Sequence, residues 1–110
     1  MRRSLQLLLE GEGYGVRAFA SAAAVQADVD VMRAACLVTD YRLGDADGLS
    51  LLRGLRRIGW GGPAILMTAF ASPSLAEQAQ SEGFTQLFAK PFRPHLLVEA
   101  VGRAVGCQRA

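Results

Sequence analysis

Short apolar runs alternate with helical patterns along this chain, and the runs predict strands. Residues 34–38 and 64–67 are continuously apolar, which is typical of strands covered by helices on both faces. Residues 86–89 predict a third, shorter strand. In residues 16–20, small apolar residues alternate with Arg17 and Phe19, and this period of two predicts a fourth strand.

The segments between these runs have helical spacing. Leu5, Leu8 and Leu9 share one face of a first helix, which the glycines at 11, 13 and 15 end. The next helix is Ala-rich, and we expect it to begin after an N-cap at Ser21 and to continue to about residue 32.

Three further helices follow the later runs. Asp47 is placed to cap a helix whose apolar stripe comprises Leu49, Leu52, Leu55 and Ile58. Ser72 and Pro73 open the next helix, because proline is tolerated in the first turn, and Gly83 closes it. The last helix begins at Pro94 and keeps helical spacing at Leu97, Val101, Ala104 and Val105.

Strands that alternate with helices predict parallel βαβ units with right-handed crossovers. The expected fold class is therefore α/β, with an open doubly wound parallel sheet. The chain has 110 residues, which suits a single domain spanning 1–110. No linker, repeat or low-complexity segment interrupts it.

Composition and charge exclude several classes of protein. The apolar runs are too short to cross a bilayer, and polar residues interrupt the basic, leucine-rich start before it could form a signal peptide. Cys36 and Cys107 suit reduced thiols of a cytoplasmic protein better than a disulfide. The net charge is only +2, and Arg53, Arg56 and Arg57 form a solvated helix face more readily than a nucleic-acid surface.

Polar residues with complementary chemistry follow three successive strands. Asp40, Thr68 and Lys90 each stand where an apolar run ends, and the carboxyl ends of parallel strands meet at one edge of the sheet. Lys90 is also the only lysine among the twelve basic residues, which favours a specific need for a compact ammonium. A carboxylate can act as a nucleophile towards phosphorus, and an ammonium and a hydroxyl can stabilise the transferred group.

In this order and spacing, the residues resemble the receiver domains of two-component response regulators, the CheY-like family. The resemblance covers residues 4–105 and rests on three motifs: Val38-Thr39-Asp40-Tyr41-Arg42-Leu43-Gly44 with Asp47-Gly48-Leu49, Ile65-Leu66-Met67-Thr68-Ala69, and Phe88-Ala89-Lys90-Pro91-Phe92. It implies a cis Lys–Pro bond, a cytoplasmic phosphorelay protein and a face read by partners in residues 73–105.

The resemblance also implies a role for each site residue. Asp40 would accept a phosphoryl group from a histidine kinase or phosphotransfer protein, and Thr68, the backbone amide of Ala69 and Lys90 would bind its oxygens. Asp40 and the backbone carbonyl of Arg42 would be ligands of Mg²⁺. The family couples an aromatic side chain to the threonine, but the matching position here is Leu87, beside Phe88.

This chain differs from the family at its start, where the family has a central strand ending in two acidic residues. Residues 1–4 already belong to the first helix, so the fold is expected to lack that strand and the acidic pair. The gap would be about 10 Å wide, or two strand spacings. The chain would have to close it, borrow a strand from a partner as a homodimer, or be marginally folded.

The same difference affects the metal. Asp40 and one carbonyl are few ligands for Mg²⁺, and Glu10 and Glu12 lie at the wrong end of their helix, so metal binding should be weak or absent. A truncated reading frame would explain the start.

Two other functions are open. One is a degenerate receiver that acts as a phosphorylation-independent protein–protein interaction module, with no chemistry. The other is a phosphatase of the haloacid dehalogenase type, which needs a second Asp two residues after its nucleophile, where this chain has Arg42.

Overall fold

The protein is described from a computed structural model, which covers the backbone of residues 2–109 and the side chains of residues 3–106. Its centre is a three-stranded parallel sheet with the order β1-β4-β5. The strands are β1 (Leu37–Asp40), β4 (Ala64–Thr68) and β5 (Gln86–Ala89). Every residue of β4, the middle strand, is buried. The predictions for the second and third apolar runs are confirmed.

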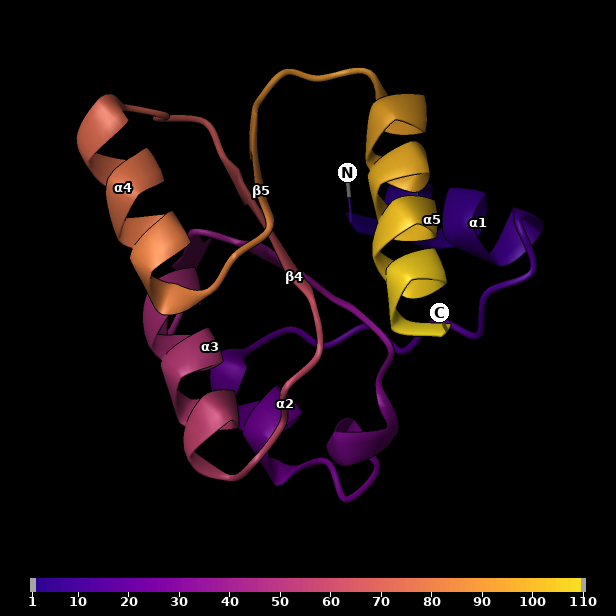
Figure 1. The fold of residues 1–110 in the computed structure, drawn as a ribbon, viewed down its shortest axis with the longest axis horizontal. Helices are drawn as coiled ribbons and strands as arrows, with labels where there is room; N and C mark the ends of the chain where they lie inside the picture. Colours follow the sequence, from indigo (N-terminus) through magenta and orange to yellow (C-terminus); the bar gives the residue numbers. More distant parts are fainter. Residues whose placement is uncertain (1, 110) are drawn as a thin grey trace.

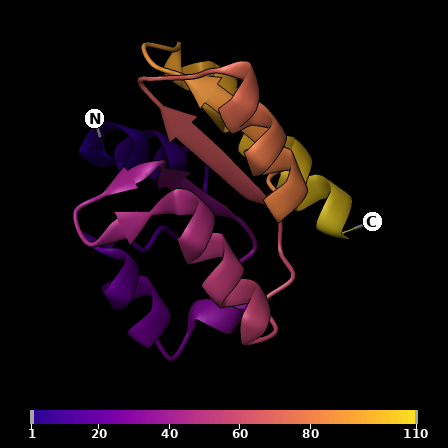
Figure 2. The same ribbon diagram turned by 90° about the vertical axis from the view of Figure 1, so that its left-hand side faces the viewer.

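Helices cover both faces of the sheet (Figures 1 and 2). On one face lie α1 (Arg2–Gly11) and α5 (Pro94–Arg109). On the other lie α2 (Ala22–Ala27), α3 (Gly48–Arg57) and α4 (Pro73–Glu82). The expected doubly wound α/β arrangement is confirmed.

The alternation of side chains along β4 divides the core into two clusters. Ala64 and Leu66 point towards α3 and α4, whereas Ile65 and Met67 point towards α1 and α5. Because both faces of a parallel sheet are covered, a continuous apolar run is the appropriate sequence for this strand.

The local signals for helix ends act as predicted. The side chains of Ser21, Asp47 and Ser72 each accept a hydrogen bond from a backbone N–H in the first turn of the helix that follows. Gly83 ends α4 at φ = 108°, a left-handed conformation that favours glycine. The Lys90–Pro91 bond is cis, as the resemblance implied.

The prediction of a strand at residues 16–20 is wrong. The described part of the chain contains no strand there, and neither of its two sheets includes this segment. A strand requires a neighbour for its backbone groups, and alternation alone cannot supply one. The segment is held by side chains instead, since Arg17 forms ion pairs with Asp28 and Asp30.

The helix expected to reach residue 32 is also shorter than predicted. α2 ends at Ala27, because Asp28 adopts an extended conformation, and a separate 3₁₀ turn η1 (Val31–Arg33) follows. The first strand begins only at Leu37, whereas the apolar run begins at residue 34. Three of the four residues of β1 are half-buried, so the full covering predicted from the sequence is wrong for this strand.

Two predicted stripe residues are exposed. Ile58 lies beyond the last turn of α3, where its side chain is 54% exposed, and Leu51 is buried in the helix instead. Leu8 is 43% exposed at the border of the α1 stripe formed by Leu5 and Leu9. Leu8 precedes the buried Leu9, and Ile58 lies about one helical turn after the buried Leu55.

The loop after β1 contains a small hairpin that was not predicted. Its strands are β2 (Arg42–Leu43) and β3 (Ala46–Asp47), and they pair antiparallel. They appear as the two magenta arrows in Figure 2. Two residues per strand are too few for a periodic signal in the sequence.

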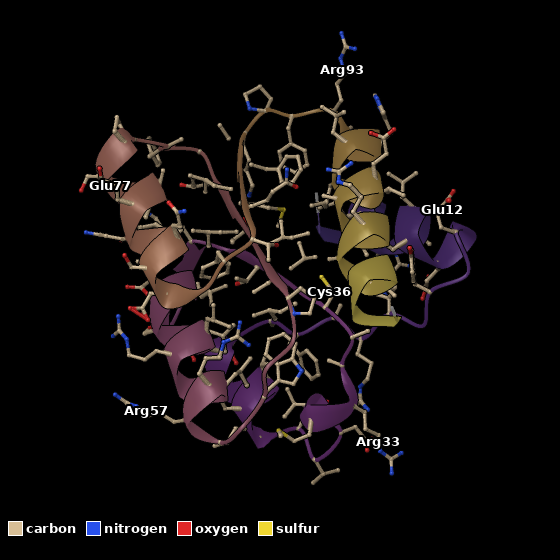
Figure 3. All side chains as sticks on the ribbon, viewed as in Figure 1. Glu12, Arg33, Cys36, Arg57, Glu77 and Arg93 are labelled. Atoms are coloured by element: carbon tan, nitrogen blue, oxygen red, sulfur yellow. The ribbon has the colours of Figure 1, made fainter. Side chains whose placement is uncertain are left out.

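Cys36 lies between the sheet and α5 (Figure 3). Burial raises the pKa of its thiol to about 11, so it is a poor nucleophile at neutral pH. The side chain of Cys107 lies outside the described part. None of the helices described is long and apolar enough to cross a membrane.

Candidate functional site

The polar residues predicted to meet at the carboxyl edge of the sheet do meet there. In the parallel register Asp40 lies opposite Met67, and Thr68 lies opposite Ala89, so the three strands end at one rim. The ammonium of Lys90, the residue after β5, contacts Oδ1 of Asp40 as an ion pair. Residues 50 positions apart in sequence are thereby brought into direct contact.

The Asp40 carboxylate has unused capacity to accept hydrogen bonds. Its Oδ1 is buried and, apart from the Lys90 ammonium, has no hydrogen-bond partner among the described residues. The side chain as a whole is 35% exposed, so a small molecule can reach it from the solvent side. A carboxylate that only one ammonium contacts can still accept hydrogen bonds from a further molecule, which suggests a site rather than a purely structural contact.

Thr68 and Ala69 present donors at the same rim. Thr68 is buried, and its hydroxyl oxygen accepts a hydrogen bond of 3.1 Å from the backbone N–H of Phe70. The hydroxyl proton is therefore oriented by the loop and is available to a further acceptor. The backbone N–H of Ala69 donates no hydrogen bond within the part of the chain that the structure describes.

Gly48 allows the hairpin to approach the end of β1. Its N–H donates to the carbonyl of Tyr41 over 2.6 Å, while the N–H of Tyr41 donates to the carbonyl of Met67. A Cβ at position 48 would lie 2.7 Å from the backbone oxygen of Asp40. Only glycine fits at this distance, and the backbone of Asp40 is held between β4 and α3 as a result.

The tip of the hairpin is tied to α2 by Asp45. Its two carboxylate oxygens accept hydrogen bonds from the backbone N–H groups of Ala22 and Ala23, at 3.1 Å and 3.0 Å. The hydrogen bonds from Ala23 and then Ala22 hold the pKa of Asp45 below its ordinary value. A negative charge at a helix N-terminus is favourable, so Asp45 links the rim of the site to the helix that follows residues 16–20.

Asp45→Asn is expected to lower stability at neutral pH, because the amide keeps only one acceptor oxygen and no charge. A depressed carboxylate pKa stabilises the fold above the unfolded-state pKa, and this contribution is lost as pH falls through the folded-state value. The difference between the variant and the parent should therefore shrink as pH falls from about 5 to about 3. Thermal melts across this range test it. Glu77→Gln, which removes one carboxylate charge from the exposed surface of α4 (Figure 3), is the control for the loss of a charge alone.

One feature of the site was not predicted from the sequence. The guanidinium of Arg42 lies 5.3 Å from the ring centroid of Phe70, which makes a cation–π contact between the loops that follow β1 and β4. Arg42 and Phe70 each lie two residues after a site residue, Asp40 and Thr68. This equal spacing was a usable signal for the contact, because the loops that follow neighbouring parallel strands begin side by side.

The match to a family model decides what this arrangement is. Residues 1–102 match the response regulator receiver domain, which is nearly the whole chain. This chain belongs to the receiver-domain family of response regulators.

Curated relatives of this receiver domain include transcriptional regulatory proteins. The regulatory protein FixJ of Rhizobium meliloti is 34% identical over 104 residues, which cover 94% of this chain and 51% of the relative. The chain thus spans about half the length of this relative.

Solved receiver structures share the fold. The FixJ-N crystal structure is 33% identical with a TM-score of 0.83, and the match covers 96% of this chain and 84% of that one. The receiver domain of the Pseudomonas aeruginosa sensor histidine kinase PA1611, solved with a magnesium ion coordinated in its active-site cleft, is 27% identical with a TM-score of 0.81 and coverage of 94% and 87%. The family, the fold and the role in phosphorelay signalling that the sequence predicted are confirmed.

Receiver domains bind Mg²⁺, but the residues described in this chain are a poor fit for a tight metal site. The partly exposed carboxylate of Asp40 can supply one ligand, yet the described residues contain no group of three or more His, Cys, Asp or Glu side chains that could hold a metal ion. Glu12 lies at the outer side of α1, away from the sheet (Figure 3). Mg²⁺ prefers an octahedral set of oxygen ligands, and this receiver domain offers few.

The position that matches the family's aromatic side chain is occupied differently here. Leu87 packs with the α2, α3 and α4 cluster, and Phe88 packs with the α1 and α5 cluster, so the two adjacent side chains point to opposite faces. The ring of Phe88 lies 5.3 Å from that of Phe92. The aromatic ring next to Leu87 is thus on the other face of the sheet from Leu87 itself.

Two of the three arginines of α3, Arg53 and Arg56, are engaged with the protein. Arg53 forms a two-fold hydrogen-bonded ion pair with Glu82, and Arg56 lies over the ring of Trp60 and donates to the carbonyls of Trp60 and Gly62. These contacts favour a structural role for Arg53 and Arg56. They do not favour the nucleic-acid surface that the sequence analysis considered. An open hollow of about 560 Å³ lies beside this pair, between α3 and α4, and contains none of the rim residues.

Proposed function

We propose that this receiver domain, as a single domain over residues 1–110, accepts a phosphoryl group on Asp40. The observation that carries the proposal is the contact of the Lys90 ammonium with a carboxylate oxygen that has no other partner among the described residues. A structural ion pair would satisfy both oxygens, whereas this one leaves a carboxylate open to solvent beside a cation.

The chemistry is the transfer of a phosphoryl group from the donor, whose leaving atom is a histidine nitrogen in a kinase or an oxygen in acetyl phosphate, to a carboxylate oxygen. A carboxylate oxygen of Asp40 attacks the phosphorus of the donor, and the bond from phosphorus to the donor's leaving group breaks, with the electron pair staying on that group. With acetyl phosphate the products are the Asp40 acyl phosphate and acetate, and no proton is consumed. The protein needs no catalytic turnover of its own, so we class it as a phosphoacceptor rather than an enzyme.

The other rim residues would stabilise the charge on the transferred group. Lys90 would exchange its contact with Asp40 for a phosphoryl oxygen, since an ammonium favours the more highly charged partner. The hydroxyl of Thr68 and the backbone N–H of Ala69 would bind other oxygens, as both donors are free of acceptors among the described residues.

The Asp40→Asn variant is expected to take up no phosphoryl group. The amide of the variant cannot replace the carboxylate as a nucleophile. The parent, treated with acetyl phosphate and Mg²⁺ and weighed by intact mass spectrometry, should gain one phosphoryl group. Asp45→Asn, the same substitution in the same loop, is the matched control and should still be labelled. Equal masses for the treated and untreated parent would leave the phosphorylation-independent interaction module as the function, and labelling of Asp40→Asn would place the phosphoacceptor elsewhere.

We infer that Mg²⁺ binds this chain weakly. Asp40 and the backbone carbonyl of Arg42 are the ligands that the resemblance assigns, and the Lys90 ammonium competes for the same carboxylate. A titration followed by the fluorescence of Trp60 should not saturate at millimolar Mg²⁺. A tight, saturable response that Asp40→Asn abolishes would contradict this inference.

The partners follow from the proposed chemistry. The phosphoryl group would come from a histidine kinase or a phosphotransfer protein, and the phosphorylated form would bind a downstream protein through residues 73–105. The relatives are transcriptional regulators, but we propose no contact of this domain itself with nucleic acid or with a membrane. A cytoplasmic location is consistent with the free thiol of Cys36, which a reducing compartment preserves.

The unpaired edge of β1 bears on oligomerisation. A homodimer formed by strand borrowing is one way to cover it, and the molar mass in solution tests that arrangement.

A further inference from the structure

Three large apolar side chains are exposed at the end of the molecule where the strands begin. Val29 is 91% exposed, Met32 49% and Ile58 54%. Val29 and Met32 belong to the turn that precedes β1, and Ile58 is the C-cap of α3, in the connection to β4. Single exposed apolar side chains are normal on a soluble protein, whereas a contiguous group of them marks an interaction site.

The local backbone brings these three side chains together. Residues 28–34 form a turn held by hydrogen bonds between residues three apart, so the side chains of Val29 and Met32 lie on the same side of it. The terminal Cε of Met32 lies 3.6 Å from the position that a Cβ on Gly59 would occupy, and Gly59 follows Ile58 directly. We call these three side chains the amino-end patch, because they lie at the amino ends of the strands.

Two exposed arginines border the amino-end patch. Arg33 follows Met32 and Arg57 precedes Ile58, and neither guanidinium forms an ion pair within the part of the chain that the structure describes. Figure 3 shows both side chains pointing away from the protein at the same end of the molecule, opposite the end that carries Arg93. The border therefore offers two cationic groups to a partner.

The acidic side chains near the amino-end patch are partly neutralised. Asp28 and Asp30 share the guanidinium of Arg17, at 3.1 Å and 3.0 Å. The side chain of Asp28 is also largely covered, since it is only 9% exposed. Sharing one arginine leaves these two carboxylates a single negative charge, which the charges of Arg33 and Arg57 exceed. The surface is therefore positive and complements an acidic partner.

An acidic protein segment fits this surface better than a nucleic acid or a lipid bilayer does. A nucleic acid would pair with the arginines through its phosphates, but its backbone offers no cover for aliphatic side chains. An anionic bilayer would accept aliphatic side chains, but it would repel the partly exposed carboxylate of Asp30, next to Val29. A helix with an apolar face bordered by carboxylates matches both the apolar side chains and the arginines.

We propose that the amino-end patch, together with Arg33 and Arg57, docks an acidic amphipathic helix of a partner protein. The apolar face of the helix covers the patch, and its carboxylates pair with the two arginines. The surface lies at the opposite end of the strands from Asp40, so this partner can bind at the same time as a phosphodonor. The proposal does not rest on phosphorylation of Asp40.

The experiment uses the full chain labelled with ¹⁵N and a synthetic peptide of about 18 residues, long enough to form a helix. Leucines three and four residues apart form one face of the peptide, and glutamates fill the other positions. On titration, the NMR signals of the backbone amides of residues 29–33 and 57–59 should shift more than those of other residues. Raising the salt concentration from about 0.05 M to about 0.5 M should weaken the affinity at least about five-fold, because exposed charge pairs are screened.

A control peptide and two matched pairs of variants make the result specific. The peptide with lysine in place of every glutamate keeps its apolar face and should bind at least about ten-fold more weakly. Val29→Ser should weaken binding at least about three-fold, whereas Leu7→Ser, in an exposed side chain of α1 on the other face of the sheet, should not. The double variant Arg33→Gln with Arg57→Gln should also weaken binding, whereas Arg93→Gln, at the opposite end of the molecule, should not.

Several outcomes would overturn the proposal. One is a set of shifted signals that lies away from both segments. Another is equal binding of the glutamate and lysine peptides, which would leave the charge of the surface without a role. A third is co-sedimentation of the protein with vesicles of phosphatidylcholine and phosphatidylglycerol that Val29→Ser abolishes, because a lipid surface would then be the occupant.

A dimer in solution that Val29→Ser dissociates would also overturn the proposal, because the amino-end patch would then belong to a second copy of this chain. Asp40→Asn should bind the glutamate peptide as the parent does. A failure of phosphorylation at Asp40 therefore leaves this test intact.

Discussion

Leu66→Ala is expected to lower the free energy of unfolding by about 2–5 kcal/mol, the range for deleting a buried leucine side chain. Leu66 has no exposed surface and lies in the middle of β4, between α3 and α4 on its face of the sheet. The sheet has three strands, so neighbouring side chains have few ways to move into the space left behind. Since a domain of this size is stable by only about 5–15 kcal/mol, the variant should be close to unfolding at room temperature.

Urea unfolding followed by Trp60 fluorescence and by circular dichroism measures this effect. Leu7→Ala deletes the same atoms from a side chain that is 57% exposed on α1, and should change stability by less than about 0.5 kcal/mol. Similar unfolding midpoints for the two variants would mean that β4 is not the centre of the core.

Gly48→Ala should be the second large effect, with a loss of about 1–3 kcal/mol and a displaced Asp40. The new Cβ would lie 2.7 Å from the backbone oxygen of Asp40 and 2.8 Å from Cδ1 of Leu66. The leucine can rotate, but the carbonyl belongs to the backbone of β1, which is held by its pairing with β4, so the hairpin must move away. Phosphoryl uptake at Asp40 should fall even under conditions in which the variant remains folded.

Gly44→Ala, at the tip of the same hairpin, is the matched control. A Cβ there would have no neighbour within 4 Å, so neither stability nor phosphoryl uptake should change appreciably. Melting temperature and intact mass of both variants are the measurements. A Gly48→Ala variant with the parent's melting temperature and labelling rate would show that the close approach of the hairpin to β1 is needed neither for stability nor for phosphoryl uptake.

The elements predicted correctly are those whose signals are local. The N-caps Ser21, Asp47 and Ser72 act within one turn of their helices, and Gly83 ends α4 through its own backbone conformation. The continuous apolar run of β4 predicted a strand covered on both faces, because no other short element accommodates it. The meeting of Asp40 with Lys90 was predicted too, since parallel strands end at one edge whatever their exact length.

The predictions that failed concern residues whose structure depends on a neighbour. Residues 16–20 alternate as a strand does, but neither sheet of the described chain includes them, because a strand also needs a partner strand, which alternation cannot supply. β1 has the composition of a central strand and the burial of an edge strand for the same reason. Asp45 and Phe70 were not identified, because the partners of each, the amides of α2 and the guanidinium of Arg42, come from segments whose approach only folding determines.

The amino-acid sequence by itself determined the order of helices and strands after residue 34, apart from the small hairpin of β2 and β3, as well as the helix caps and the chemistry available at the strand ends. Periodicity and capping act over a few residues, so they can be seen without coordinates. Only the tertiary structure decided which edge of the sheet is unpaired, which oxygen of Asp40 lacks a partner and how closely the hairpin approaches it. These depend on backbone groups from distant segments, and hydrogen bonds between such groups leave no periodic pattern in the chain.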